Sequence, residues 1–158
     1  MPHLCATRFN NNTFIEYTNQ STNEIQSTKK WIYNTPVKIS ETIFQDETIY
    51  VLEMNNSSNI IEGIGIIKNK CITSRRYKIY SDQNYNRYSY NCLYRIKRKD
   101  LTEEEEKIFK ILDILLFKGS RHFKRGHGIQ KLPIWIITNR EFNFTEYCKI
   151  IFKKHYDI

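Results

Sequence analysis

Tyrosine, arginine and lysine side chains are interleaved along one segment of the chain, residues 75–90. A tyrosine ring offers a plane on which an unpaired base stacks, and a guanidinium group offers a second plane and a fork for phosphate. A β-sheet with aromatic cross-strand pairs explains tyrosine equally well, and we favour that interpretation for Tyr77, Tyr90 and Tyr94. Residues 85–88 are expected in a loop that contacts nucleic acid. The contact residues predicted here are Arg75, Arg76, Tyr85, Arg87, Tyr88 and Arg95.

A second candidate segment, residues 118–129, combines cations with three glycines. Glycine allows the backbone to approach a phosphate closely. The Gly-x4-Gly-Lys-Ser/Thr spacing of a phosphate-binding P-loop is missing, so the prediction is a grip on a nucleic-acid backbone. The alternative is an ordinary basic loop that complements the C-terminal end of a helix dipole. The contact residues predicted here are Ser120, Arg121, Lys124, Arg125 and His127.

Patterns that support catalysis or metal binding are weak. His122 and His127 are five residues apart, which is the wrong spacing for one helix face, and no cysteine lies near them. The four cysteines form no Cys-x-x-Cys pair and are expected as reduced thiols. We therefore expect no enzyme activity, no cofactor and no metal. The alternative is a nuclease that uses the scattered carboxylates of Asp46, Glu53 and Glu62 together with a lysine.

The positive charge is segregated along the sequence. The net charge is +8, but residues 68–100 hold ten basic and two acidic side chains, and residues 118–131 hold five basic and no acidic ones. Such segregation is the electrostatic signature of a surface that binds a polyanion. A solvated basic surface without a partner is the alternative. The sequence has 24 isoleucines, 16 lysines, 15 asparagines and 11 tyrosines, residue types that A/T-rich codons favour. The segregation of the charge, and not the high content of lysine or tyrosine, therefore indicates a binding surface.

Length and composition fit one globular domain over residues 1–158. Hydrophobic residues make up 40% and charged residues 27% of the 158, enough for a core without disulfide or metal staples. Residues 1–9 lack the apolar region of a signal peptide, and no stretch approaches the roughly 18 apolar residues of a membrane span. These features predict a cytoplasmic chain that is not secreted and has no membrane partner.

The elements that must position the two segments are of α+β type. In the first half, the clearest pattern is a hairpin in which residues 49–54 and 60–67 bracket a polar turn. Gly63 and Gly65 inside the second strand predict a bulge or a close approach. The other predicted pieces are a strand over 4–9, an Asn-rich turn, a helix from a Ser21–Glu24 capping box to about Trp31, a loop over 31–36 and a weak strand or turn over 39–44.

In the second half, the best helix begins at Thr102, with Glu105 completing a capping box, and ends at Lys118-Gly119. Its predicted apolar stripe is Ile108, Ile111, Leu112 and Leu115. Before it, strands are predicted over 77–80 and 90–98, the latter with Tyr90, Cys92, Tyr94 and Ile96 on one face. After it come a basic loop to Lys131, a strand over 132–138 and a final helix over about 145–155.

The order of these pieces over about residues 30–138 resembles the PUA-like superfamily, whose relatives include EVE, ASCH and YTH domains. The resemblance lies in the glycine-bearing hairpin, the strand over 90–96, and the long helix with its Gly-rich loop. It implies a small mixed β-barrel flanked by about three helices, with a pocket beside the barrel for RNA or a modified base. Trp31 and Trp135 would supply aromatic walls for that pocket; each is otherwise a core residue.

The A/T-rich style and several short runs also resemble small proteins of large nucleocytoplasmic DNA viruses. The runs are Met1-Pro-His-Leu, Glu53-Met-Asn-Asn, Gly63-Ile-Gly-Ile-Ile-Lys-Asn69 and Phe117-Lys-Gly-Ser-Arg-His122. Two functions are therefore expected, from different classes. The first is a module that binds RNA or single-stranded DNA. The second is a structural or interaction protein of a virion or transcription complex, located in the virion or viral factory, with its basic face on packaged DNA or an acidic partner.

Overall fold

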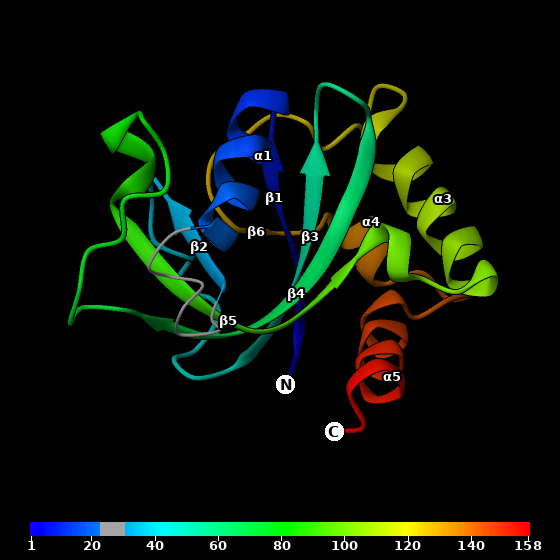
Figure 1. The fold of residues 1–158 in the computed structure, drawn as a ribbon. Coiled ribbons are helices and arrows are strands. Elements are labelled where there is room, and N and C mark those ends of the chain that lie inside the picture. The colour runs from blue at the N-terminus through cyan, green and yellow to red at the C-terminus, as the bar shows by residue number, and fades with distance from the viewer. Residues whose placement is uncertain (23–30) are drawn as a thin grey trace.

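The fold is built on one curled sheet of six strands in the order β2-β5-β4-β3-β1-β6 (Figure 1). The computed structural model describes residues 1–22 and 31–158. The strands are β1 (His3–Phe9), β2 (Trp31–Thr35), β3 (Thr48–Asn55), β4 (Ile60–Cys71), β5 (Tyr88–Lys97) and β6 (Gln130–Lys131). β1 runs parallel to β3 and all other pairs are antiparallel. Within the described ranges β2 and β6 remain edge strands, so the predicted α+β class is confirmed but the predicted small β-barrel is only a half-barrel.

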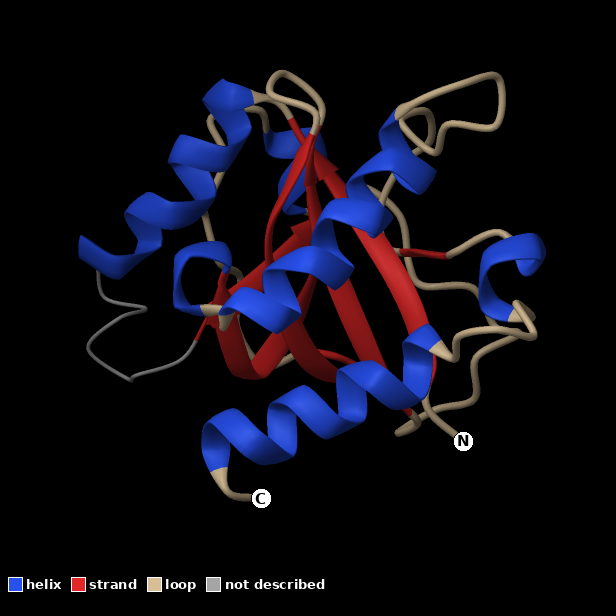
Figure 2. Ribbon diagram, turned by 90° about the vertical axis from the view of Figure 1, so that its right-hand side faces the viewer, coloured by secondary structure: helices blue, strands red, loops and turns tan. Residues whose placement is uncertain are grey.

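Helices cover both faces of this sheet. The α-helices are α1 (Asn11–Thr18), α3 (Glu103–Phe117), α4 (Ile134–Ile137) and α5 (Phe144–Tyr156), and short 3-10 turns are η1 (Asn19–Thr22), η2 (Gln83–Asn86) and η3 (Arg98–Asp100). α1 lies inside the curl of the sheet, whereas α3 and α5 lie against its outer face (Figure 2). In the described part of the chain, none of the helices combines the length and apolar character needed to cross a bilayer.

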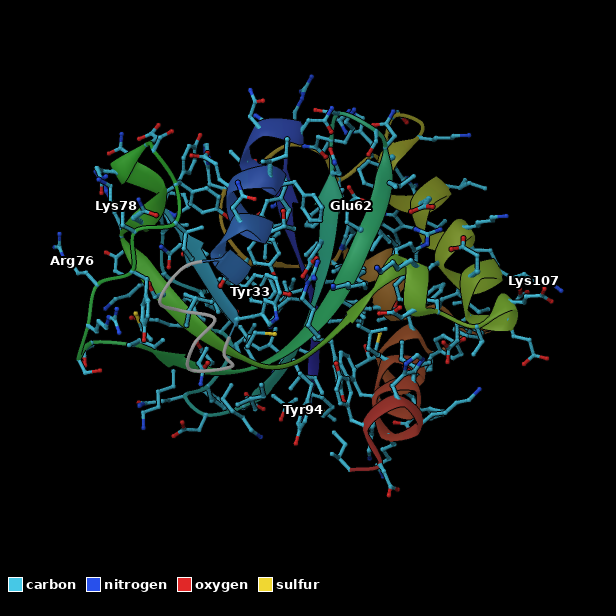
Figure 3. All side chains as sticks on the ribbon, viewed as in Figure 1. Tyr33, Glu62, Arg76, Lys78, Tyr94 and Lys107 are labelled. Atoms are coloured by element: carbon cyan, nitrogen blue, oxygen red, sulfur yellow. The ribbon has the colours of Figure 1, made fainter. Side chains whose placement is uncertain are left out.

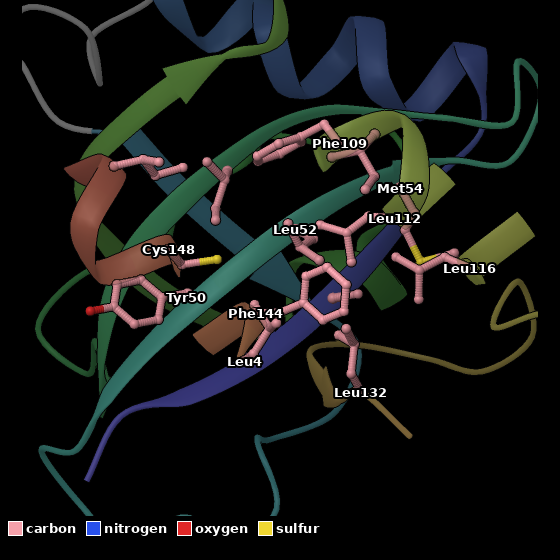
Figure 4. Packing of buried hydrophobic residues seen from close by; sticks show 14 of the residues in the cluster. Leu4, Tyr50, Leu52, Met54, Phe109, Leu112, Leu116, Leu132, Phe144 and Cys148 are labelled. Carbon is pink, nitrogen blue, oxygen red and sulfur yellow. The ribbon is translucent and has the colours of Figure 1, made fainter. Parts of the chain in front are cut away.

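Strand alternation divides the interior into two cores. In β3, Tyr50, Leu52 and Met54 face α3 and α5, while Ile49 and Val51 face the inside of the curl. Successive strand residues point to opposite faces, so a strand covered on both sides is apolar at nearly every position. Figure 4 shows the outer core, in which residues of β1 and β3 pack against α3 and α5.

The predicted hairpin is confirmed as β3 and β4, and its glycines make room for neighbouring side chains. A Cβ on Gly65 would lie 2.8 Å from the Cys92 sulfur and 2.9 Å from the Tyr33 ring. One on Gly63 would lie 2.9 Å from the Glu53 carboxylate. The register of the hairpin also shifts between Glu53 and Met54, as a bulge requires.

The predicted alternation of β5 holds only as far as Cys92. Ile67 of β4 pairs with Cys92 and Ile66 pairs with Tyr94, so Leu93 is an extra residue in the strand. One inserted residue exchanges the faces of everything beyond it. Tyr94 and Ile96 consequently face α5 and α3, and Arg95 faces the inside of the curl, contrary to the predicted pattern.

Two segments predicted as a turn and a loop form regular secondary structure, α1 and β2. The Asn-rich turn is α1, which begins because the Asn10 side chain accepts from the Thr13 amide while the Thr13 hydroxyl accepts from the Asn10 amide. The predicted loop over 31–36 is β2, paired along its length with β5. Pro36 enforces extended geometry on Thr35, and this suits a strand as well as a loop. Residues 39–44 form a turn. The helix predicted from Ser21 to about Trp31 falls mainly on residues 23–30, which lie outside the described residues.

Two predicted strands are wrong. Residues 77–80 form a loop, because their backbone groups bond to Asn86: its Oδ1 accepts from the Tyr80 amide (3.0 Å) and its Nδ2 donates to the Tyr80 carbonyl (2.7 Å). No residue of the strand predicted over 132–138 is in a strand: β6 ends at Lys131, before this segment, which contains Pro133. Proline donates no amide to a ladder and suits the start of a helix, and α4 follows it.

The long helix α3 and the final helix α5 are confirmed. Thr102 and Glu105 form the predicted capping box, and Gly119, with φ +81°, follows the last turn. The buried stripe differs from the predicted one: Phe109, Leu112 and Leu116 are buried, while Ile111 is 47% exposed. Ile108 and Leu115 are partly buried at the edge of the outer core.

Candidate nucleic-acid interface

The two sequence segments predicted to bind nucleic acid meet at one cleft. Tyr80 and Tyr85 line it from residues 77–88, and Lys124, Gly126 and His127 line it from residues 118–129. Its volume is about 250 Å³. The remaining lining residues come mainly from β1, from the start of α1 and from the ends of β2 and β3. They are Thr7, Arg8, Phe9, Asn10, Thr13, Asn34, Pro36, Asn56 and Gly128. None of these is acidic, so the cleft is electropositive.

Arg8 is the most enclosed cation of this cleft. Its Nε donates to the Phe123 carbonyl (2.9 Å), its Nη1 donates to the Gln130 side-chain oxygen (2.8 Å), and its Cζ lies 4.1 Å from the centre of the Phe123 ring. Burial lowers the pKa of Arg8 to about 10, so the group is still cationic at neutral pH. Its Nη2 is buried and has no hydrogen-bond partner among the described residues.

The tyrosine wall of the cleft is held in place by two asparagines. Asn86 bonds to Tyr80 as described above, and its Oδ1 also accepts from Asn34 Nδ2 (2.9 Å). Asn34, on β2, donates further to the Tyr77 carbonyl (2.7 Å). These bonds anchor the loop to the sheet and leave the Tyr85 ring 38% exposed, edge-on to Tyr80 at 6.1 Å.

The opposite wall is the glycine-bearing loop. Gly126 and Gly128 have φ of +120° and +71°, conformations that favour glycine. The loop is tied to the β3–β4 turn by Asn56, whose Nδ2 donates to the Lys124 carbonyl (2.8 Å). The Oδ1 of Asn56 is buried and has no partner among the described residues. The cleft therefore contains one unsatisfied donor, on Arg8, and one unsatisfied acceptor.

A second basic cleft, of about 460 Å³, lies along the same tyrosine loop. It is lined by Arg76, Lys78 and Arg87 together with Tyr77, Tyr88, Gln83 and Asn86. Arg76 and Lys78 extend from this end of the molecule in Figure 3, and Lys107 on α3 extends from the other end. Arg87 Nη2 donates to the Asn84 side chain (3.1 Å), which orients one guanidinium group without neutralising it.

Arg95 is a correction to the predicted interface. Its side chain is only 5% exposed and forms a two-pronged ion pair with Glu53, through Nε (2.8 Å) and Nη2 (2.6 Å). The hydroxyls of Tyr17 and Tyr33 donate to the same carboxylate (2.9 and 2.6 Å). Burial opposes the charge on Arg95, but the Glu53 carboxylate more than compensates and raises the pKa of Arg95. This network lies inside the curl, where Figure 3 places Tyr33, and it commits the Arg95 guanidinium group to Glu53. Arg95 lines neither of the two basic clefts; it lines a separate one with Trp31 and Phe14.

The predicted tryptophan pocket is also wrong. Trp31 is partly buried against the inner core, with its ring 5.6 Å from the Tyr17 ring and 5.0 Å from Arg95 Cζ, and it lines a cleft with Phe14 and Arg95. Trp135 belongs to α4 on the outer face, where Arg121 lies 5.4 Å above its ring. The sheet separates the two indoles, so they do not face one pocket.

The other predicted contact residues are at the surface. Arg75, Arg76, Arg87, Ser120 and Arg125 are exposed and Tyr88 is half-buried. Arg75 lies over the Tyr77 ring at 5.1 Å, and Lys38 lies over the Tyr88 ring at 5.7 Å. Ser120 and Arg121 are outside both clefts, whereas Lys124 and His127 are inside the first one.

The sequence interpretation missed Arg8, Asn34, Asn56 and Asn86. Arg8 lies in a segment with an acidic excess and inside a predicted strand, and nothing in its spacing marks it. The asparagines are hidden by an Asn-rich composition. The one usable signal was Asn86, because an asparagine inside a tyrosine-rich loop is suited to bonding its own backbone.

Metal ligands and reactive thiols do not gather in the described ranges, 1–22 and 31–158. No three His, Cys, Asp or Glu side chains there are placed to hold a metal ion. Burial raises the pKa values of Cys5, Cys92 and Cys148 to about 12, which keeps these thiols protonated. Of the scattered carboxylates, that of Glu53 is buried and paired with Arg95.

Comparisons with models of protein families, with curated proteins and with solved structures were made over the whole chain, and none of the three finds a match.

Proposed function

We propose that this protein binds unpaired RNA or single-stranded DNA, with the cleft between residues 77–88 and 118–129 as the central contact. The observation that carries the proposal is that one electropositive cleft is lined by both segments, together with Arg8. The segments are about forty residues apart in sequence, and each was expected to bind nucleic acid for reasons of its own. Their meeting at one cleft supports a shared ligand.

The chemistry of the two clefts suits a single strand. The exposed part of the Tyr85 ring offers a stacking plane for a base that has no partner. Arg76, Lys78 and Arg87 offer charges for phosphates beside it. Both features are independent of base identity, so the proposal is of strand binding with little sequence preference.

A relation to the PUA-like superfamily is part of this proposal. The glycine-bearing hairpin of β3 and β4, at the centre of a curled sheet flanked by helices, supports it. In such domains RNA or a modified base would be expected beside the barrel, and the cleft found here lies where the β1, β2 and β3 ends meet the two loops.

Salt-titrated binding tests the proposal. Fluorescence anisotropy would be measured with single-stranded RNA, single-stranded DNA and duplex DNA of matched sequence. Each phosphate neutralised on a single strand contributes about −0.7 to the slope of log K against log salt. The five cations of the two clefts, Arg8, Arg76, Lys78, Arg87 and Lys124, therefore predict a slope of about −3.5. The triple change R76Q/K78Q/R87Q should reduce the steepness by about 2. The control K107Q removes a charge from α3, at the far end of the molecule, and should leave the slope unchanged.

Absence of binding at about 50 mM salt, or a slope near zero, would contradict the proposal, because cationic contacts to phosphate always release counterions. Stoichiometric copurification with capsid proteins, without nucleic-acid binding, would instead favour the structural role in a virus particle.

A further inference from the structure

The cleft holds two buried polar atoms that the described residues leave unsatisfied. Arg8 Nη2 is a charged donor and Asn56 Oδ1 is an acceptor, and both residues line the same cavity. A buried polar group without a partner is destabilising, more so when it is charged. A ligand that brings an anionic oxygen to Arg8 and a hydroxyl or amino group to Asn56 satisfies both.

The loop segment that covers the Arg8 guanidinium group contains two glycines, Gly126 and Gly128. Gly126 lies directly against the guanidinium group: a Cβ there would be 3.3 Å from Nη2 and 2.6 Å from the Gln130 side-chain oxygen. Gly126 and Gly128 both have positive φ, so this part of the loop has conformational freedom that other residues lack. An anion that reaches Nη2 must displace this backbone, and the two glycines permit such a shift.

Size and charge decide which anion fits. A volume of about 250 Å³ is below the roughly 300–1,000 Å³ of pockets that enclose drug-sized ligands, so the cleft accepts the end of a molecule and not a length of strand. A phosphodiester inside a strand carries one negative charge and is bonded to a nucleoside on each side, so the strand must leave the cleft in two directions. A phosphomonoester carries about −1.5 to −2 at neutral pH and is attached at one point only.

We infer that the cleft binds a nucleoside phosphomonoester, with the phosphate on Arg8 and Lys124 and the sugar or base between Asn56 and Tyr85. This inference rests on the proposed function and makes it more specific: the protein prefers a strand whose end is phosphorylated. A free mononucleotide has the same chemistry and is the other possible source of the ligand.

The test compares matched short single strands that carry a 5′-phosphate, a 3′-phosphate or only hydroxyl ends, with free nucleoside 5′-monophosphate as competitor. We expect one phosphorylated end to raise affinity at least tenfold over hydroxyl ends, since a charge-assisted hydrogen bond of about 1.5–3 kcal/mol corresponds to ten- to a hundredfold. R8Q should abolish this preference. K124Q should reduce it without disturbing the Arg8 contacts to Phe123 and Gln130, and so serves if R8Q does not fold. K107Q should leave it intact.

Each outcome has a distinct meaning. Equal affinity for phosphorylated and hydroxyl ends, with salt-dependent binding retained, overturns this inference and leaves the proposed function standing. A preference that survives both R8Q and K124Q places the phosphate elsewhere and also overturns it. Competition by the mononucleotide at the affinity of the phosphorylated strand supports the phosphomonoester site and assigns it to free nucleotides. No binding of any probe overturns both proposals.

Discussion

Arg87 and Arg95 belong to the same basic segment of the sequence, but Arg87 is exposed and Arg95 forms a buried ion pair with Glu53. Removing one partner of a buried pair leaves the other charge uncompensated, which costs about 3–5 kcal/mol. R95M should therefore reduce the free energy of unfolding by that amount, measured by urea denaturation. The double variant R95M/E53M should recover only part of the loss, because it leaves no buried charge but deprives the buried hydroxyls of Tyr17 and Tyr33 of their acceptor. If R95M were as stable as the wild type, the pair would not be buried in solution.

Residue type alone predicted which side chains can bind a strand, but not which of them are at the surface. Arg95 and Arg87 look equivalent in the sequence, and the difference arises from Leu93, the extra residue that turns Arg95 inward. A one-residue bulge leaves no mark on a composition or a charge count. Arg8 is the opposite case: an isolated arginine in an apolar strand becomes a cleft residue only through Phe123 and Gln130, more than a hundred residues away.

At the scale of elements, α3 is joined to α5 by a carboxylate. Glu105 caps α3, and its Oε1 lies at hydrogen-bond distance, 2.8 Å, from His155 Nε2 on α5. Lys154 Nζ lies 4.0 Å from the other carboxylate oxygen, Oε2. Burial acts to raise the pKa of Glu105, but the Thr102 amide, His155 and Lys154 outweigh it and lower that pKa below 4.5. A group with a depressed folded-state pKa contributes stability above its unfolded pKa and loses it as the pH falls.

Thermal stability should accordingly fall as the pH is lowered from about 5 to about 3. E105Q keeps the capping hydrogen bond, since glutamine also completes a capping box, but removes the charge. Its melting temperature should depend less on pH in this range, whereas E104Q, an exposed change in the same helical turn, should behave as the wild type does. An unchanged pH dependence in E105Q would show that Glu105 does not link the two helices.

Elements with local signals were predictable and those defined by partners were not. The β3–β4 hairpin has its polar turn directly between its two strands, and α3 has its capping residues in its first turn. Both elements were therefore predicted from short stretches of sequence. β2 was missed because its pairing with β5, some fifty-five residues away, decides its conformation. Residues 77–80 have strand composition, but Asn86 takes the backbone groups that a neighbouring strand would need.

For the whole molecule, the cleft is a property of the curled sheet and its connections and not of either loop. The half-barrel brings residues 77–88 to the end of β2 and residues 118–129 to the end of β1, and Arg8 lies between them. Charge segregation in the sequence indicated both loops but gave no sign that they face each other. The charge count also overstated the positive charge of residues 68–100 that is free to bind a ligand. Arg95 is paired with Glu53, and Arg98 is paired with Glu106 and Asp113.

A shared cleft makes a prediction that two separate basic loops do not. Amides in exposed loops exchange with solvent readily, and a ligand that orders a loop slows this exchange. A single-stranded oligonucleotide long enough to cover one cleft should therefore slow hydrogen exchange in residues 77–88 and 118–129 together, at the same concentration, as followed by mass spectrometry. The outer face of α3 should be unaffected. In R8Q, protection of residues 118–129 should be lost first, because Arg8 holds the Phe123 carbonyl in place. Protection of one loop without the other, in the wild-type protein, would mean that the two segments bind separately and that their meeting at one cleft has no bearing on the ligand.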